Sequence, residues 1–156
     1  MTPKIKAILL FIAVFAIDQY IKFIFVNGFE AKGSCISLVL AYNTGVAFSM
    51  FEFLGAYLKY IQIGLLLGIA IYLYKDREMF HTYIYPVSLI FSAGISNILD
   101  RFIHIGVVDY VYWHCGFDFA IFNLADVMID VAIVWILWIH YRSEEHTSEL
   151  QSPNTI

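Results

Sequence analysis

Four apolar segments, each close to the length needed to cross a bilayer, constrain this chain more than any other feature. They cover residues 5–26, 54–74, 83–99 and 119–141. A membrane-spanning helix needs about 20 mostly apolar residues, and the hydrocarbon core admits only helices or closed barrels. The composition agrees, because 61% of the residues are hydrophobic and only 14% are charged, whereas soluble domains carry about a quarter charged residues. We therefore expect an all-α membrane protein with four transmembrane helices.

The basic residues at the ends of these segments predict the orientation. Lys and Arg in short flanking segments favour the cytoplasmic side of a membrane. If the chain crosses the membrane four times, most of the flanking basic residues lie on the same side of the membrane: Lys4, Lys6, Lys75, Arg77 and Arg142. We therefore expect both termini in the cytoplasm, and residues 29–53 and 101–118 on the outer side. Lys32 and Arg101 are exceptions to this bias.

The two expected outer loops differ in character. Apolar side chains alternate over residues 36–40, and residues 43–45 read Asn-Thr-Gly. This pattern predicts a small strand or hairpin lying on the membrane surface. The second loop is rich in aromatic residues, as interfacial segments are: Phe102, Tyr110, Tyr112, Trp113, Phe117 and Phe119. We expect the second loop to lie at the interface between water and lipid.

Several kinds of site are not expected. Cys35 and Cys115 are the two cysteines, too few for a disulfide framework or a paired CxxC metal site. His114, Cys115 and Asp118 form a loose cluster, but no HExxH sequence lies on any apolar segment, which argues against a zinc metalloprotease. The chain contains no GxSxG sequence, which argues against a serine hydrolase. It also has no basic face of the kind that binds nucleic acids. We predict no metal, no cofactor and no nucleic-acid partner.

The last residues differ abruptly from the rest of the chain. Polarity rises at Arg142, and residues 142–152 read RSEEHTSELQS, which resembles the translation of a widely used sequencing adapter. We predict a single membrane domain over residues 1–141 and a non-native tail over residues 142–156, which we exclude from fold reasoning. Genomic reads that continue unbroken through these codons would contradict this prediction.

Asp109 and Asp126 are the strongest catalytic candidates. Asp109 lies in the second outer loop and Asp126 lies within the first two turns of the fourth segment, so both are expected near the outer surface. Charges beside membrane segments are costly and usually functional. Two carboxylates that face each other can share one proton, so that the ionised one activates water while the neutral one polarises a peptide carbonyl. Alternatively, Asp126 caps or pairs structurally and Asp109 is merely solvated.

Polar residues beside this pair have structural and functional interpretations. Asp100 and Arg101 end the third segment, with Asn97 one turn earlier on the same face. We favour an ion pair between Asp100 and Arg101; alternatively, Arg101 holds a carboxylate or a loop in position. Asn123 can cap the fourth helix or donate to a substrate backbone, and both possibilities stay open.

Three further groups extend this polar cluster. Asp18 and Lys22 are four residues apart on the first segment, so they share a face and can pair, tying that segment to the cluster. Residues 43–45 form an ordinary turn or line a substrate groove with the amide of Asn43. Asp130 lies one turn deeper than Asp126 on the same face, where an acid is costly unless it is protonated or paired. We assign Asp130 no role.

Five short motifs, in order along the four segments, together resemble one family, lipoprotein signal peptidase, also called signal peptidase II. They are Asp18-x-x-x-Lys22, Asn43-Thr44-Gly45-Val46-Ala47-Phe48, Asn97-Ile98-Leu99-Asp100-Arg101, Val107-Val108-Asp109 and Phe122-Asn123-Leu124-Ala125-Asp126. Each motif is weak alone, but the ordered set is specific. The resemblance covers the chain up to about residue 141. Ser92-Ala93 departs from it, because the family usually has Gly-Gly there.

The resemblance implies a four-helix aspartic peptidase of the bacterial inner membrane, with a small β-cradle on the membrane surface and an active site near the periplasmic face. It implies removal of the signal peptide from prolipoproteins, just before the cysteine that carries diacylglycerol. The implied partners are that substrate and membrane lipids, and the enzyme is expected to be monomeric. By position, Asp109 and Asp126 match the catalytic pair. The matching supporting residues are Asp18, Lys22, Asn43, Gly45, Ala47, Asn97, Asp100, Arg101, Asn123 and Ala125.

Two other classes of function remain open. A transporter or proton-conducting subunit can use intramembrane acids as an ion pathway, although the acids here gather near the outer surface instead of stepping across the bilayer. A structural scaffold for a larger complex needs no carboxylate cluster at all. Cleavage of a lipopeptide in detergent, with a chelator present, distinguishes an aspartic peptidase from both rivals and from a metalloprotease.

Overall fold

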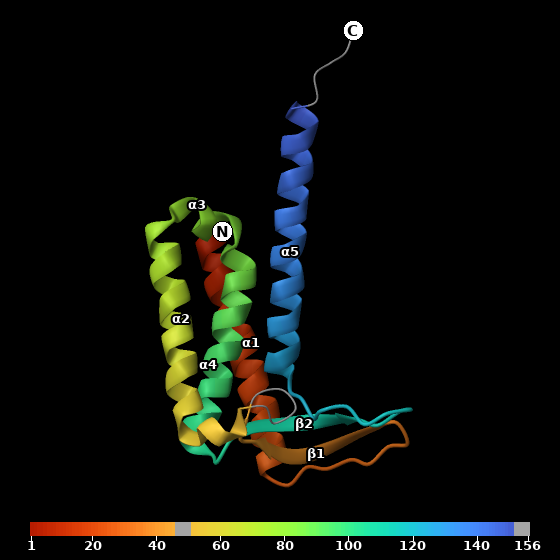
Figure 1. Cartoon of the computed structure of the whole chain (residues 1–156). Coiled ribbons are helices and arrows are strands. Elements are labelled where there is room, and N and C mark those ends of the chain that lie inside the picture. Colours follow the sequence, from red (N-terminus) through yellow and green to blue (C-terminus); the bar gives the residue numbers. More distant parts are fainter. Residues whose placement is uncertain (46–50, 152–156) are drawn as a thin grey trace.

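The computed structural model describes residues 1–45 and 51–151, without the side chains of residues 52 and 144–151. Long helices stand beside one another, and a two-stranded sheet lies across one end of them (Figure 1). The elements in chain order are α1 (Pro3–Val26), β1 (Ile36–Asn43), the 3₁₀ helix η2 (Glu52–Tyr57), α2 (Leu58–Lys75), α3 (Arg77–Thr82), α4 (Ile84–Ile103), β2 (Val107–Trp113) and α5 (Leu124–Gln151).

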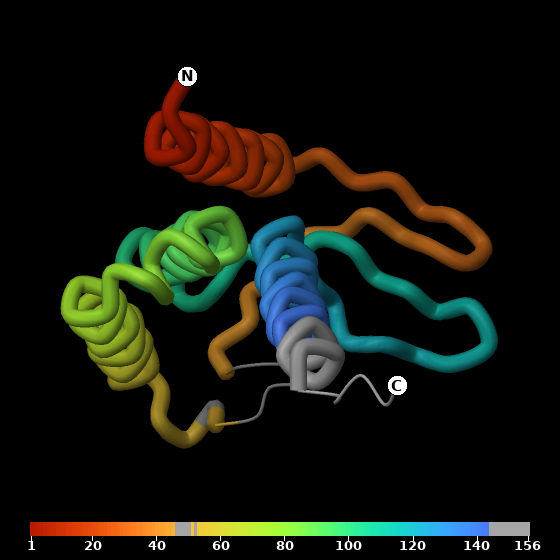
Figure 2. Tube along the Cα trace, turned by 90° about the horizontal axis from the view of Figure 1, so that it is seen from above, coloured from red at the N-terminus to blue at the C-terminus, as the bar shows by residue number. Residues whose placement is uncertain are grey.

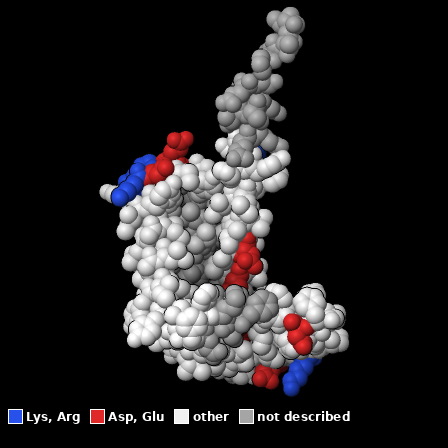
Figure 3. Space-filling view, viewed as in Figure 1, with Lys and Arg blue, Asp and Glu red and all other residues white. Residues whose placement is uncertain are grey.

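Three helices of the described chain are long and apolar enough to cross a membrane: Pro3–Val26, Phe53–Lys75 and Leu124–Ser143. They coincide with the first, second and fourth predicted segments. Most of their side chains face outward and not into the protein, as expected for helices that are apolar on all sides. Figure 3 shows the result, a broad surface that is uncharged apart from one acidic patch, between two ends that carry charged groups.

α4 lies between α1 and α2, with α5 beside it (Figure 2). Its serines at intervals of four residues face α1: Ser88 Oγ donates to the carbonyl oxygen of Ala7 at 2.6 Å, and Ser92 Oγ donates to that of Phe11 at 2.9 Å. Small side chains at this spacing let helices approach closely. Ser92 and Ala93 therefore pack in the helix interface although neither is a glycine. The same polar face lowers the hydropathy of α4, which is absent from the three apolar candidates.

The sheet joins the two outer loops to each other. β1 pairs antiparallel with β2, and Asn43 lies opposite Val107. The predicted strand of the first loop is therefore present, but its partner is the second loop, for which the sequence predicts only an aromatic interfacial segment. Gly106 lets the strand ends meet, because a Cβ there would lie 2.5 Å from the carbonyl oxygen of Asn43. This pairing brings Asn43 beside the strand that carries Asp109.

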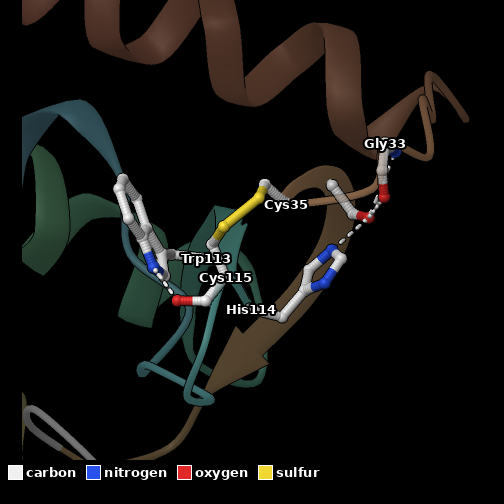
Figure 4. Close-up of a disulfide and its surroundings, with 6 residues drawn as sticks. Gly33, Cys35, Trp113, His114 and Cys115 are labelled. Carbon is white, nitrogen blue, oxygen red and sulfur yellow. Dashed lines mark hydrogen bonds between the residues drawn. A yellow bond between two sulfur atoms is a disulfide. The ribbon is translucent and has the colours of Figure 1, made fainter.

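A disulfide closes the far end of the sheet. Cys35 precedes β1 and Cys115 follows β2, and the bond between them joins positions 80 residues apart, with Cα atoms separated by 4.4 Å (Figure 4). Next to it, the indole nitrogen of Trp113 donates to the carbonyl oxygen of Cys115 at 3.2 Å. The cysteine count predicts no disulfide framework and gives no sign of this single bond, because only the pairing of β1 with β2 brings the two residues together.

Removing the disulfide is expected to destabilise the sheet. The bond limits the freedom of the unfolded loops, so a double variant with Cys35→Ser and Cys115→Ser should lose about 2–4 kcal/mol of stability. Thermal unfolding in detergent, with and without reductant, measures the effect. Reductant should lower the melting temperature of the wild type to that of the variant and leave the variant unchanged. Equal melting temperatures for the oxidised and fully reduced wild type would contradict the prediction.

The helices differ from the predicted segments between the second and third segments and at both ends of the fourth. The short helix α3 lies between the second and third predicted segments. α5 begins at Leu124 and not at residue 119, because Phe122 is bonded to β2 through Val111 in both directions, at 2.9 and 3.1 Å. At its other end, α5 continues to Gln151. The foreign origin of residues 142–156 stays a prediction.

Candidate active site

A buried ion cluster joins α1 and α4. Lys22 Nζ lies 2.8 Å from Asp18 Oδ2 and 2.7 Å from Asp100 Oδ2. All three residues are at most 2% exposed. The predicted pair of Asp18 with Lys22 is present and ties α1 to the polar cluster. One lysine between two carboxylates leaves a negative charge over, and buried charges need further hydrogen bonds to be stable.

Backbone and hydroxyl groups supply these hydrogen bonds. Asp18 accepts from Ser96 Oγ and, at 3.0 Å, from the backbone nitrogen of Ala125. Asp100 accepts at 3.1 Å from the backbone nitrogen of Val108. Because Ala125 lies in the first turn of α5 and Val108 belongs to β2, the cluster fixes both elements to α1 and α4.

Arg101 does not pair with Asp100, so the favoured prediction of an ion pair between them is wrong. Consecutive helix residues point about 100° apart, and Asp100 therefore reaches Lys22 while Arg101 reaches the first outer loop. Arg101 Nη2 donates to the carbonyl oxygen of Gly45, and Nη1 donates to that of Asn97 at 3.4 Å. These contacts agree with the alternative, in which Arg101 holds a loop in position.

Asp109 is buried in β2, with 1% of its surface exposed. Its Oδ1 accepts from Asn123 Nδ2 at 2.7 Å, and its Oδ2 accepts from Asn43 Nδ2 at 3.1 Å. Asn43 is itself held by a local turn, because the backbone nitrogen of Gly45 donates to its Oδ1 at 3.0 Å. Residues 43–45 therefore form the predicted turn, and the amide of Asn43 also contacts an acid. A substrate groove lined by this amide stays a prediction.

Asp126 and Asn123 cap the first turn of α5 reciprocally. The backbone nitrogen of Asp126 donates to Asn123 Oδ1 at 2.9 Å, and that of Asn123 donates to Asp126 Oδ2 at 3.1 Å, as in a capping box. Asp126 Oδ1 also accepts from Asn97 Nδ2 at 3.0 Å. Asn123 thus caps the helix and binds both acids, Asp109 through its side chain and Asp126 through its backbone.

Asp109 and Asp126 line one cavity of about 540 Å³. Small-molecule and peptide sites commonly have volumes of about 300–1,000 Å³. Residues 119–122 supply an apolar wall, and the other polar side chains in the lining are Asn43, Gln62, Asn97, Arg101 and Asp130. Two carboxylates beside converging amides in such a space can bind a water molecule together with a peptide group.

The pKa of Asp109 is raised from its ordinary value of 3.8 to about 7, first by burial and then by the negative charge of Asp126. Hydrogen bonds from Asn43 and Asn123 and the charge of Lys22 act in the opposite direction, because they favour the ionised carboxylate. At neutral pH the carboxyl of Asp109 therefore gains and loses a proton readily. A pair of this kind can provide one acid and one base at the same pH.

The predicted supporting residues gather around this cavity and the ion cluster. Nine of them take part in the contacts described above: Asp18, Lys22, Asn43, Gly45, Asn97, Asp100, Arg101, Asn123 and Ala125. Ala47 lies outside the described residues. Lys22 connects the two groups, since its Nζ donates to Asn97 Oδ1 at 2.8 Å and Asn97 in turn donates to Asp126.

Three polar residues of the cluster, Gln19, Ser96 and Tyr110, were not predicted as site residues from the sequence. Gln19 Nε2 donates to Asp100 Oδ1 at 2.9 Å and to Ser96 Oγ at 2.8 Å. The hydroxyl of Tyr110 accepts from the backbone nitrogen of Leu124 at 2.9 Å, and burial raises the pKa of Tyr110. Ser96 could have been predicted, because it lies one turn before Asp100 on the polar face of the same helix. Gln19 and Tyr110 offer only their position next to an aspartate.

The loose cluster of His114, Cys115 and Asp118 does not converge. His114 is bonded to the hydroxyl of Ser37 at 2.9 Å, Cys115 is in the disulfide, and Asp118 accepts from the hydroxyl of Tyr112 at 2.7 Å. Within the described ranges, no three His, Cys, Asp or Glu residues lie where they could hold a metal ion together.

Comparisons with known proteins agree with one another. The family model of signal peptidase (SPase) II matches residues 10–142. The lipoprotein signal peptidase of Wolinella succinogenes is 60% identical over 129 residues, which are 83% of this chain and 88% of that protein. The lipoprotein signal peptidase of Sulfurimonas denitrificans is 54% identical over 135 residues, which are 86% of this chain and 87% of that protein.

Two solved structures, each of a bacterial membrane enzyme studied by the in meso method, are similar in fold. One has a TM-score of 0.75 at 20% identity and covers 97% of this chain and 94% of its own. The other has a TM-score of 0.70 at 25% identity and covers 85% of this chain and 90% of its own. The family match and the relatives above 50% identity show that this chain belongs to the signal peptidase II family.

Proposed function

We propose that this protein is a membrane aspartic endopeptidase that removes the signal peptide from prolipoproteins, cutting just before the cysteine that carries diacylglycerol. Membership of the signal peptidase II family and relatives named lipoprotein signal peptidase support the peptidase activity and its substrate class. One observation carries the aspartic mechanism. Asp109 and Asp126 line the same cavity and are both bonded to Asn123.

In the proposed reaction, Asp109 and Asp126 activate one water molecule between them. The ionised carboxylate takes a proton from the water as it attacks the scissile carbonyl, and the protonated carboxyl donates to the carbonyl oxygen. When the tetrahedral intermediate breaks down, a carboxyl proton passes to the amine of the departing cysteine. The raised pKa of Asp109 supports a pair that holds one proton near neutral pH, and that proton belongs to the pair as a whole.

The surrounding amides and ions position this pair. The side-chain amides of Asn43, Asn97 and Asn123 each donate to one of the two acids, and Lys22 donates to Asn97 from the buried side. These groups belong to different helices and strands, so the whole fold restricts the two carboxylates. Orientation matters because a displacement of about 1 Å at a reacting group can cost about 10²-fold in rate.

We place the protein in the bacterial inner membrane with four spans, both termini in the cytoplasm and the cavity near the periplasmic face. The 20 residues of α4 cover about 30 Å and pack among the three apolar helices, which supports a fourth span. Disulfides persist in the oxidising periplasm, so the bond between Cys35 and Cys115 supports an outer location for the sheet. Lys75 and Arg77, at the opposite end of α2, support a cytoplasmic location there.

The lipid on the substrate explains how one site accepts many signal sequences. In our proposal the signal helix lies among the spans, while the acyl chains of the modified cysteine sit in the outer leaflet. This anchor holds the scissile bond in register without contacts to each side chain. The enzyme acts as a monomer, since one chain supplies every residue of the proposed site, and its partners are the prolipoprotein and membrane lipids.

A lipopeptide cleavage assay tests the proposed function. The purified full-length protein in detergent is given a synthetic lipopeptide with a diacylglyceryl cysteine, with and without EDTA, and mass spectrometry identifies the products. We expect cleavage directly before the cysteine at the same rate in both conditions. Activity that EDTA removes and zinc restores would indicate a metalloprotease. No cleavage, together with proton flux in vesicles, would indicate a transporter.

Removing the amide of Asn43 is expected to shift the pH dependence of cleavage. Its hydrogen bond stabilises the ionised form of Asp109, so Asn43→Ala should raise the pKa of Asp109 above about 7. The alkaline limb of kcat/KM, where the shared proton is lost, then moves to higher pH by about half to one unit. Rates between pH 4 and 9 measure the shift, with Glu30→Gln as an exposed control. An alkaline limb that stays in place or moves to lower pH would contradict the prediction.

A further inference from the structure

Gln62 of α2 carries a polar atom that the protein itself does not use. Its Oε1 is buried, and among the described residues it is the buried side-chain oxygen or nitrogen that has no hydrogen-bond partner. Such an atom is costly in a folded protein and needs an explanation. Gln62 lines the cavity that contains Asp109 and Asp126. A molecule bound in that cavity can supply the missing donor.

Asp130 is a second unused acceptor in the same cavity. It lies one turn after Asp126 on α5, about 6 Å further along the helix, and its exposed side chain makes no hydrogen bond or ion pair with the described residues. Figure 3 shows acidic atoms at the surface beside the lower part of α5, within the otherwise uncharged belt. An acid at this depth without a partner is expensive and points to a ligand.

The other polar groups of this cavity are already occupied. Asn43 and Asn97 donate to Asp109 and Asp126, and Arg101 donates to the carbonyl oxygens of Gly45 and Asn97. These contacts hold the acids and the first outer loop. Gln62 on α2 and Asp130 on α5 line the same space, and each contributes a side-chain oxygen that accepts from none of the described residues. A ligand that fits both must present hydrogen-bond donors.

We propose that Gln62 and Asp130 accept hydrogen bonds from backbone N–H groups of the substrate residues that precede the scissile bond. This inference rests on the proposed function. A peptide bond inside a helix is protected from attack, because its carbonyl is bonded within the helix and its neighbours crowd it. The end of the signal helix must therefore unwind to reach the acids, and unwinding frees backbone N–H groups that lipid cannot bind and that need acceptors from the protein.

The geometry favours the residues on the signal-peptide side of the bond. Asp130 lies on the side of Asp126 away from the sheet, and Gln62 lies about 6 Å from the start of α2. A signal helix that reaches the acids from within the membrane passes this region first. Because every peptide has backbone N–H groups, these contacts bind the unwound segment without selecting its side chains.

A double-mutant cycle between enzyme and substrate tests the inference. In a set of lipopeptides, each backbone N–H in turn among the residues before the scissile bond is replaced by an ester oxygen, and the scissile amide is kept. Wild type should lose about 5–10-fold in kcat/KM at one or two positions, mainly through KM. Gln62→Leu should lower kcat/KM for the all-amide lipopeptide by a similar factor. For this variant, an ester at the position that Gln62 contacts should cause no further loss of kcat/KM. Asp130→Ala should be coupled in this way to a different position.

The controls separate binding from folding. Lys59→Leu removes a cation of α2 that stacks over the rings of Tyr60 and Phe102 outside the cavity, and its ester-to-amide ratios should equal those of the wild type. Gln62→Leu removes an unpaired buried acceptor, so the substrate-free melting temperature should stay equal or rise. Wild-type ratios in both Gln62→Leu and Asp130→Ala would overturn the inference. Failure of the wild type to cleave the all-amide lipopeptide would overturn the proposed function instead.

Discussion

Asparagine in place of Asp126 or Asp109 is expected to abolish cleavage of the lipopeptide, with kcat/KM lowered by at least about 10³-fold. Asparagine has nearly the shape of aspartate, but it neither takes a proton from water nor passes one to the leaving amine. The fold should persist, because the ion cluster of Lys22 does not include either acid. Initial rates with the diacylglyceryl lipopeptide, at equal amounts of folded protein, measure the loss.

Two comparisons make this test specific. Glu30→Gln, which neutralises an exposed acid, should retain wild-type rates and shows the effect of losing a carboxylate elsewhere. The double variant Asp109→Asn with Asp126→Asn should be no slower than either single variant, because residues that act as a unit are not additive. A single variant that folds and keeps more than about a tenth of wild-type activity would remove its residue from the proposed pair.

Replacing Lys22 by methionine is expected to destabilise the folded protein strongly. Lys22 bonds Asp18 at 2.8 Å and Asp100 at 2.7 Å, and all three are nearly inaccessible to solvent. Without the ammonium group, two buried carboxylates face each other unpaired. Breaking a buried ion pair from one side costs about 3–5 kcal/mol. Thermal unfolding of the substrate-free protein in detergent should show a large fall in melting temperature, or no folded protein at all.

A second substitution checks the cause of this instability. Adding Asp100→Asn to Lys22→Met removes one of the two unpaired charges and should recover part of the lost stability. Lys59→Met, on α2, deletes a lysine outside the cluster and should change the melting temperature little. A melting temperature for Lys22→Met equal to that of the wild type would contradict the role of Lys22 as the centre of the cluster.

The helices could be predicted from the sequence because they depend on residues that are close together in the chain. Twenty apolar residues in a row already satisfy their own backbone in lipid, and three of the predicted segments reappear as α1, α2 and α5 with small changes in their ends. α4 was predicted by the same rule, yet it is distinguished by a polar face with Ser88 and Ser92 turned towards α1. The pairing of the strands could not be predicted in this way, because it joins residues about 70 positions apart and leaves no local pattern in the sequence.

The site divides along the same line. The five ordered motifs placed Asp109, Asp126 and their supporting residues in one group, and the resemblance to signal peptidase II predicted their roles. Within that group the choice of partners followed from geometry alone. Asp100 pairs with Lys22 of another helix and not with its neighbour Arg101, since adjacent helix residues diverge. The bond between Cys35 and Cys115 likewise depends on the register of β1 against β2.

A helical membrane protein could be recognised from hydropathy, and the grouping of its acids was predicted from motif order, because both are properties of neighbouring residues. Which polar groups are hydrogen-bonded and which are not depends on how the helices and the sheet pack. Asn123 reaches both acids, and Oε1 of Gln62 reaches none of the described donors. The physical reason is that hydrogen bonds form at about 3 Å between atoms, and contacts of that kind between distant segments exist only once the helices and the sheet have packed.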